Sequence, residues 1–253
     1  MAYLMRMDAG PIQGPAMPST SGNHHRKLST TMEARSVQDV VIFGGKGTAV
    51  NLAEQIEDAR QRFAYPMRVL GFAIDDPALG NSIAGFPVLC GVREAWPLFA
   101  DSDVRFLFAL YRPDVMPARV HLLHSLGIPQ DRFVNFIHPQ AYVAPSVSMG
   151  FGNAVFSQAN LMHEVVLGNF NLINSGAVIE HDSRLGNCTF LAARTVIGSH
   201  IRIGNGVFIG LNTAVRENVS IEDYAFVGMG SVVLKNVDSH TQVYGVPARK
   251  NSI

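Results

Sequence analysis

The chain has 253 residues, with 20 Lys and Arg against 20 Asp and Glu, so its formal net charge is zero. This length allows one or two domains, and the balanced charge gives no case for binding nucleic acid or an anionic membrane. The two cysteines, Cys90 and Cys188, are too few for a disulfide framework or a multi-cysteine metal site, which fits a reducing cytoplasm. We therefore expect a cytoplasmic protein whose partner is a small molecule.

Residues 1–36 differ in composition from the rest of the chain. They are rich in Pro, Gly, Ser, Thr, Met and His, and they contain no apolar stretch long enough for a signal peptide or a membrane span. We expect this segment to be a disordered extension that precedes the regularly patterned part of the chain.

Short apolar runs alternate with helical patterns between residues 37 and 135. Strands that alternate with helices predict a small parallel α/β sheet. Ligands of such a sheet bind at the carboxyl ends of its strands. The runs cover residues 40–43, 69–74 and 104–110, and the helical patterns cover about 48–60, 92–100 and 114–126.

Two loops at these strand ends carry residue types that suit a phosphate or a sugar. The backbone N–H groups of a glycine loop can approach a phosphate, a lysine adds a point charge, and acidic residues can bind a ribose or a base. A plain tight turn and an Asp-Asp-Pro turn explain the same residues about equally well. The candidates are Gly44, Gly45, Lys46, Gly47 and Thr48 in the first loop, and Asp75 and Asp76 in the second.

An aliphatic residue or Met occupies every sixth position from residue 137 to residue 233, seventeen times in succession. A period of six matches neither an α-helix nor a half-buried strand, and it is typical of the hexapeptide repeat of a parallel β-helix. Three hexads per coil place each residue beneath the residue 18 positions later, which gives about five coils. Glycine often follows the anchor, as expected where the chain turns a corner and φ must be permissive. The anchors are Ile137, Val143, Met149, Val155, Leu161, Leu167, Ile173, Ile179, Leu185, Leu191, Ile197, Ile203, Ile209, Val215, Ile221, Val227 and Val233.

Three histidines fall at outward positions of the predicted β-helix: His163, His181 and His200. An imidazole beside a carboxylate can take up a proton near neutral pH, and His181 lies between Glu180 and Asp182. A polar surface explains the same three residues, and residue type alone does not choose among them.

From about residue 40 to residue 248 the sequence resembles the hexapeptide acetyltransferases that modify nucleotide-linked amino sugars, and the related sialic-acid O-acetyltransferases. Residues 174–182 and 245–250 carry the most specific part of this resemblance. It implies a Rossmann-like nucleotide-sugar-binding domain over residues 37–135. It also implies an all-β left-handed β-helix, the acyltransferase domain, over residues 136–253 with a C-terminal tail. Members of this family assemble as homotrimers with active sites between subunits.

The same resemblance implies an acetyl-CoA-dependent N-acetyltransferase that acts on the amine of a nucleotide-linked amino-deoxy sugar and needs no metal. It assigns the general base to His181, the acidic neighbour to Asp182 and the acceptor contact to Asn174. Either Asp182 or Glu180 would orient the imidazole. The residues that it places beside acetyl-CoA, including the amide that stabilises the oxyanion, are Gly198, Ser199, Gly210, Gly228, Arg249 and Lys250.

The sequence departs from the family where the nucleotide would bind. Gly47-Thr48 stands where the family has Gly-His, and Tyr111-Arg112 stands where it has Gly followed by Asn or Asp. A hexapeptide O- or N-acyltransferase with a non-nucleotide acceptor or another acyl-CoA is therefore the main alternative. A zinc lyase of the γ-carbonic-anhydrase kind is disfavoured because the chain lacks a His-x4-His pair. A non-catalytic scaffold is disfavoured by the complete set of Asn174, His181 and Asp182.

Overall fold

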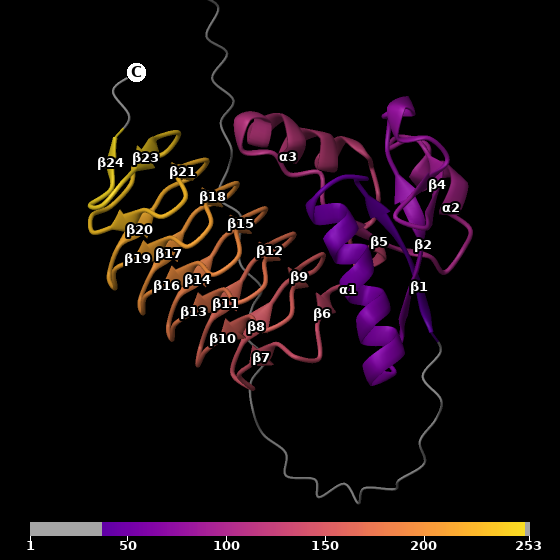
Figure 1. Cartoon of the computed structure of the whole chain (residues 1–253). Coiled ribbons are helices and arrows are strands. Elements are labelled where there is room, and N and C mark those ends of the chain that lie inside the picture. Colours follow the sequence, from indigo (N-terminus) through magenta and orange to yellow (C-terminus); the bar gives the residue numbers. More distant parts are fainter. Residues whose placement is uncertain (1–36, 251–253) are drawn as a thin grey trace, which may run out of the picture. The chain divides into compact units, whose positions relative to one another are not determined.

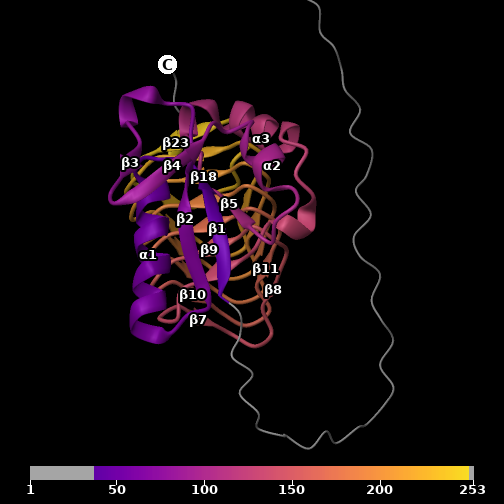
Figure 2. The ribbon, with the colours of Figure 1, turned by 90° about the vertical axis from the view of Figure 1, so that its right-hand side faces the viewer.

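The computed structural model describes residues 37–250, all of which belong to one compact unit. The disordered extension that we expect over residues 1–36 lies outside the described residues. The first part of the described chain is a five-stranded sheet in the order β3-β4-β2-β1-β5 (Figures 1 and 2). Its strands are β1 (Gln38–Phe43), β2 (Met67–Ala73), β3 (Ser82–Ile83), β4 (Phe86–Cys90) and β5 (Arg105–Phe108).

This sheet is parallel except at one edge, as the alternation of strands and helices predicts. β1 runs parallel to β2 and β5, β2 runs parallel to β4, and β3 forms an antiparallel hairpin with β4. No helix within residues 37–250 has the length and apolar character needed to cross a membrane. The α-helices are α1 (Thr48–Phe63), α2 (Ala95–Phe99) and α3 (Met116–Ser125), and 3-10 turns cover Pro77–Leu79, Pro113–Val115 and Gln130–Arg132.

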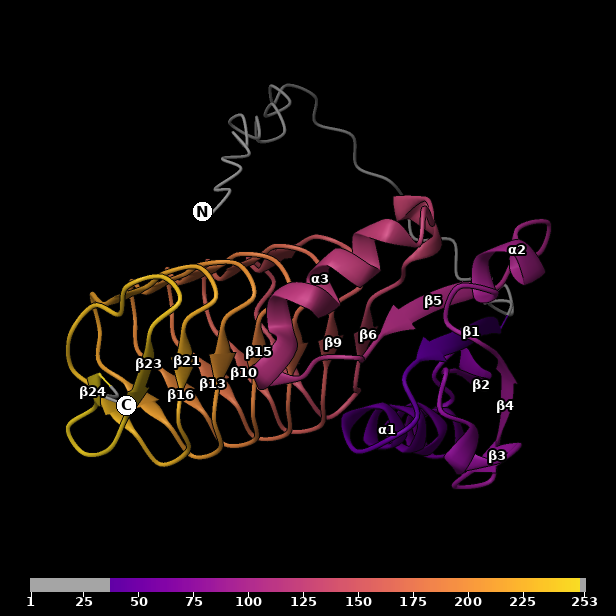
Figure 3. The ribbon, with the colours of Figure 1, turned by 90° about the horizontal axis from the view of Figure 1, so that it is seen from above.

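The second part is a stack of short parallel strands wound into three sheets (Figures 1 and 3). Each of the seventeen strands β6 to β22 has two residues and ends on a predicted anchor. Ile179 pairs with Leu161 below it and Ile197 above it, which confirms the predicted stacking interval of 18 residues. These stacked parallel sheets fit the predicted left-handed β-helix.

We name the three sheets after their first strands. The β6 sheet contains β6 (Phe136–Ile137), β9 (Ala154–Val155), β12 (Leu172–Ile173), β15 (Phe190–Leu191), β18 (Phe208–Ile209), β21 (Phe226–Val227), β23 (Gln242–Tyr244) and the antiparallel β24 (Arg249–Lys250). The β7 sheet contains β7 (Tyr142–Val143), β10 (Asn160–Leu161), β13 (Val178–Ile179), β16 (Val196–Ile197), β19 (Ala214–Val215) and β22 (Val232–Val233). The β8 sheet contains β8 (Ser148–Met149), β11 (Val166–Leu167), β14 (Arg184–Leu185), β17 (Arg202–Ile203) and β20 (Ser220–Ile221).

The glycines that follow the anchors have a different role from the one expected. Positive φ occurs three residues after an anchor, for example at Asp182 (φ 60°), and none of the glycines directly after an anchor has it. These glycines are needed because the next coil lies close above them. A Cβ atom on Gly168 would lie 2.6 Å from the carbonyl oxygen of Gly186, and one on Gly210 would lie 2.5 Å from the amide nitrogen of Met229. Our explanation by permissive φ was therefore wrong, and coil stacking is the physical reason.

The α/β sheet and the β-helix share one hydrophobic cluster. It includes Phe106 and Phe133 from the first part and Phe170 and Leu172 from the second. Hydrogen bonds from α1 add to this contact, because the Gln55 side chain bonds to two successive coils at one corner of the β-helix. The α/β sheet is thus held against the β6 sheet.

Candidate functional site

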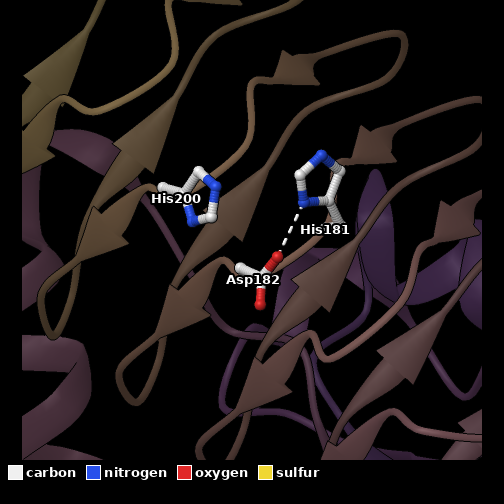
Figure 4. Close-up of side chains that lie close together, drawn as sticks. All are labelled: His181, Asp182 and His200. Carbon is white, nitrogen blue, oxygen red and sulfur yellow. Dashed lines mark hydrogen bonds and ion pairs between the residues drawn. The ribbon is translucent and has the colours of Figure 1, made fainter.

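His181 and Asp182 lie in the turn between β13 and β14, on the corner that joins the β7 and β8 sheets. The Nδ1 atom of His181 is 2.7 Å from Oδ2 of Asp182, and the two side chains are 47% and 42% exposed (Figure 4). The Nε2 atom of His181 makes no hydrogen bond within residues 37–250. The ring is thus oriented through one nitrogen and leaves the other available to a substrate.

This hydrogen bond favours the ionised form of Asp182 and one tautomer of His181. It lowers the pKa of Asp182, because the bond to His181 stabilises the carboxylate form. An ionised Asp182 accepts the hydrogen bond, so Nδ1 of His181 carries the proton of the neutral ring. The free Nε2 atom therefore has the lone pair that a general base needs.

The other outward histidines lack such a partner. The Nδ1 atom of His163 lies 3.0 Å from the hydroxyl of Ser146 and its Nε2 atom is 4.0 Å from Glu164. His200 lies on the same corner as His181 one coil higher, with their ring centroids 5.3 Å apart in a T-shaped arrangement (Figure 4). Geometry therefore selects His181 from the three histidines.

One group of side chains within residues 37–250 could hold a metal ion, because three potential ligand atoms from His, Cys, Asp or Glu lie within 4.8 Å of one another. This group consists of His181, Asp182 and His200. A zinc lyase of the γ-carbonic-anhydrase kind would need three histidines, whereas this group offers two. A metal on Nδ1 of His181 would also have to replace the bond to Asp182. We interpret the group as a hydrogen-bonded acid–base pair with a second histidine beside it.

Asn174 lies at the other end of β13, on the corner that joins the β6 and β7 sheets. Its side chain is buried, and its Nδ2 atom donates to the carbonyl oxygen of Leu191 at 2.8 Å. Within one chain the structure does not bring Asn174 into contact with His181. The two residues lie on the same coil, at the two corners on either side of β13.

The two amides predicted beside the reacting thioester differ in availability. The Gly198 N–H donates to the carbonyl of Val215 at 2.9 Å, so the β-helix already uses it. The Ser199 N–H makes no hydrogen bond within residues 37–250, and Ser199 stands one coil above His181. Ser199 therefore offers a free backbone donor one coil above His181.

The residues predicted along the CoA path lie higher on the β-helix. A Cβ atom on Gly228 would lie 2.2 Å from the ring of Tyr244, so this glycine, like Gly210, is required by stacking. Arg249 and Lys250 form the exposed strand β24 and line a cavity of about 280 Å³. Neither of these side chains forms an ion pair within the described part of the chain, which leaves both positive charges free.

A second cavity, of about 440 Å³, lies at the carboxyl ends of β1, β2 and β5. It brings together five of the seven predicted loop residues, and Gly47 and Thr48 are not among its lining residues. Several additional side chains line it. The predicted residues present are Gly44, Gly45, Lys46, Asp75 and Asp76, and those that join them include Tyr111, Arg112, Arg119 and Leu122.

All three predicted charged groups in this cavity already have partners. The Lys46 ammonium lies 2.6 Å from Asp76, and this contact lowers the pKa of the Asp76 carboxyl. The Asp75 carboxylate accepts the backbone N–H of Val92 at 2.8 Å. Arg119, on α3, was not predicted. Its place in the cavity depends on how α3 packs, and no local sequence pattern signals that packing.

Comparison with known proteins agrees with this arrangement. No protein-family model matches the chain, and no curated protein matches it. Among solved structures, the chain is similar to perosamine N-acetyltransferase from Caulobacter crescentus, determined as a histidine-to-asparagine mutant in complex with CoA and GDP-perosamine. The identity is 27%, the match covers 86% of this chain and 99% of that chain, and the TM-score is 0.73.

Two further structures share the fold at lower identity. The acetyltransferase domain of PglB from Neisseria gonorrhoeae FA1090, in complex with acetyl coenzyme A, is 22% identical with a TM-score of 0.72, over 85% of this chain and 99% of that chain. WeeI from Acinetobacter baumannii AYE is 21% identical with a TM-score of 0.67, over 85% of this chain and 100% of that chain. The likeness to the Caulobacter crescentus enzyme confirms the predicted resemblance to hexapeptide-repeat acetyltransferases of nucleotide sugars and the prediction of an acyltransferase. The two structures of lower identity support the fold.

Proposed function

We propose that the protein is an acetyl-CoA-dependent N-acetyltransferase that acts on the amine of a nucleotide-linked amino-deoxy sugar, with His181 as general base. The observation that carries this proposal is the 2.7 Å bond between His181 and Asp182 on an exposed corner of the β-helix. The similar enzyme from Caulobacter crescentus, which was determined with CoA and GDP-perosamine, supports the choice of co-substrate and acceptor class. The reaction requires no metal.

In this mechanism the amine of the sugar attacks the thioester carbonyl carbon of acetyl-CoA. Nε2 of His181 takes a proton from the amine as the new C–N bond forms, and Asp182 stabilises the resulting imidazolium. The Ser199 N–H donates to the oxyanion of the tetrahedral intermediate. The C–S bond then breaks, and the imidazolium returns the proton to the departing CoA thiolate. Asn174 contacts the acceptor from the opposite end of β13.

Acetyl-CoA would lie along the upper coils. Gly198, Gly210 and Gly228 leave the backbone without side chains there, and Arg249 and Lys250 supply positive charge for the CoA phosphates.

We further propose a homotrimer with active sites between subunits. The outward side chains of the β7 sheet are largely apolar, and Val196 among them is 44% exposed. The β8 sheet presents Arg184 and Arg202 at the equivalent positions. An apolar face that borders the His181 corner fits a second copy of the chain, which would enclose the exposed His181 and Asp182.

In this proposal residues 37–135 form a Rossmann-like domain that binds the nucleotide sugar. The loop from Gly44 to Thr48 and the pair Asp75–Asp76 surround the bound nucleotide. Residues 136–253 form the left-handed β-helix that carries acetyl transfer. We place the enzyme in the cytoplasm, where both nucleotide sugars and acetyl-CoA are made.

A second candidate is an acyltransferase with a non-nucleotide acceptor. It is favoured by one observation: Asp76 pairs with Lys46, the lysine expected to meet a phosphate. Direct binding separates the two candidates. No binding of GDP, UDP or dTDP at high concentration would favour the second candidate.

The experiment that tests the proposal measures release of the CoA thiol from acetyl-CoA with GDP-, UDP- and dTDP-linked 4-amino-4,6-dideoxy sugars. We expect at least one of them to be acetylated much faster than the corresponding free amino sugar. Equal or faster turnover with the free amino sugars would reject the nucleotide-linked acceptor. Stoichiometric zinc in the purified protein, together with lyase activity, would revive the zinc alternative.

A further inference from the structure

The cavity at the strand ends holds three positively charged side chains: Lys46, Arg112 and Arg119. Lys46 is paired with Asp76 at 2.6 Å, and the Nε atom of Arg112 donates to Asp114 at 3.1 Å. Arg119 forms no ion pair within the described residues. Its charge is therefore the one in this cavity that no acidic side chain balances.

Arg119 also carries an unsatisfied hydrogen-bond donor. Its Nε atom is the one buried side-chain nitrogen or oxygen atom in residues 37–250 that lacks a hydrogen-bond partner. A buried donor of a charged group without a partner is destabilising, and such atoms are rare in folded proteins. Because Nε has no bond to lose, the guanidinium can turn toward an anion in the cavity without breaking any existing hydrogen bond at that atom.

The surroundings of Arg119 limit where its ligand can lie. Met116 and Leu123 are buried and fix α3, so the side chain of Arg119 reaches the cavity from a rigid helix. Gly44 and Gly45, which carry no side chains, line the same cavity. A planar guanidinium presents two parallel N–H groups, which matches the spacing of two phosphate oxygens.

We propose that Arg119 binds the diphosphate of the nucleotide-linked acceptor, in the role that the sequence assigns to Lys46. The inference rests on the proposed function and extends it by naming the residue that selects a diphosphate-linked acceptor over a neutral one. Arg119 is a substrate-binding residue that lies outside the reacting groups. The glycine loop then lets the diphosphate come close to the backbone, and Lys46 holds Asp76 in place.

Calorimetric titration of the full-length protein with GDP, UDP and dTDP tests this role. For the nucleotide that binds best, Arg119→Gln is expected to weaken binding by about 10- to 100-fold, since it removes a charge-assisted hydrogen bond to phosphate. The nucleotide affinity of Arg119→Lys should lie between those of the wild type and Arg119→Gln, because lysine keeps the charge and loses the paired donors. Arg68→Gln is the matched control, and it should change binding only slightly because Arg68 is exposed, is already paired with Asp39 and does not line this cavity.

Kinetics give a second measurement. In Arg119→Gln the KM for the nucleotide sugar should rise while kcat and the KM for acetyl-CoA stay close to the wild-type values. Wild-type nucleotide affinity in Arg119→Gln would overturn the role of Arg119 and leave the proposed function intact. Failure of the wild-type protein to bind any of the three nucleotides would overturn both.

If Arg119→Gln does not fold, the nucleotide affinity of Arg119→Lys tests the role of Arg119 instead. Wild-type-like binding by Arg119→Lys would count against paired recognition of phosphate oxygens.

Discussion

The contact between His181 and Asp182 depends on a left-handed backbone conformation at the corner of the β-helix. Asp182 has φ of 60°, in the left-handed region where Asp and Asn are tolerated better than most residues. With this conformation at the corner, the side chain of Asp182 meets that of the preceding residue, His181. Because the equivalent corners hold other residue types, such as Phe170 and Arg194, the acidic side chain of Asp182 is explained by the proposed chemistry rather than by the turn.

Asp182→Asn removes the charge of this side chain and keeps the turn. Asn keeps the shape and tolerates the same φ, so the melting temperature should hardly change. The lost charge no longer supports the imidazolium or the required tautomer, and we expect kcat to fall by about 10²–10⁴-fold. Steady-state kinetics beside a Glu164→Gln control, adjacent to His163, would check this. Unchanged kcat in Asp182→Asn would remove Asp182 from the mechanism.

The two classes of glycine in the β-helix should respond differently to alanine. Gly168 lacks positive φ, but a Cβ atom there would lie 2.6 Å from the Gly186 carbonyl oxygen. Gly230 has φ of 67° and open space around it. We expect Gly168→Ala to lower the free energy of unfolding by about 1–3 kcal/mol through overpacking, and Gly230→Ala by about 1 kcal/mol through backbone strain. Urea unfolding measures both. A larger loss for Gly230→Ala would contradict the stacking explanation.

At the scale of elements, one buried histidine connects α1 to the first coil of the β-helix. The side chain of His138 is 1% exposed, its Nδ1 atom accepts the Gln140 N–H at 3.1 Å, and its Nε2 atom lies 3.5 Å from Asp58 on α1. Burial lowers the pKa of His138, and this effect outweighs the opposite influence of Asp58. The folded protein therefore holds His138 neutral.

This pKa shift makes the docking of α1 sensitive to acid. The unfolded chain has the ordinary histidine pKa of about 6.5 and binds a proton first as the pH falls. The contribution of His138 to stability is thus complete above about pH 6.5 and is lost as the pH falls from there toward its lower folded pKa. We expect the wild type to lose more unfolding free energy between pH 7.5 and 5.5 than His138→Gln does. Equal losses in urea titrations would contradict a buried neutral His138.

Most of these elements could be predicted from the sequence, because their causes are local. An aliphatic residue at one position of each hexad fixes the strand positions and the stacking interval, and residues 40–43 followed by glycines fix the first strand and loop. The period does not reveal which of the six positions has positive φ, so the role of glycines such as Gly168 was misassigned. Arg119 was missed because its position depends on the packing of α3, which involves residues distant in sequence.

The proposed site was also predicted unevenly. His181 and Asp182 are adjacent, so their contact follows from a single turn of the chain. Whether an amide such as that of Gly198 is free depends on the coil above it. The Gly198 N–H donates to the carbonyl oxygen of Val215 in that coil and is therefore not free. Asn174 and His181 lie on different corners of the same coil. This separation follows from how the chain winds and could not be predicted from their spacing in the sequence.

The apolar face of the β7 sheet leads to a prediction about assembly. Val196→Glu would place a charge in the centre of this face, between Val178 below it and Ala214 above it. We expect sedimentation to show a trimer for the wild type and smaller species for Val196→Glu, since desolvating an unpaired carboxylate in an interface is strongly unfavourable. Arg202→Glu, on the polar β8 sheet, serves as a control and should remain trimeric. A monomeric wild type would contradict the assembly.

Replacing His181 tests whether this residue removes a proton from the acceptor amine. The rate of acetyl transfer to the best nucleotide amino sugar is measured for the wild type and His181→Asn at saturating acetyl-CoA and acceptor, together with the affinity of each protein for CoA and nucleotide. We predict that the rate falls by about 10²–10⁴-fold while both affinities stay close to those of the wild type. Wild-type turnover in His181→Asn would contradict this role.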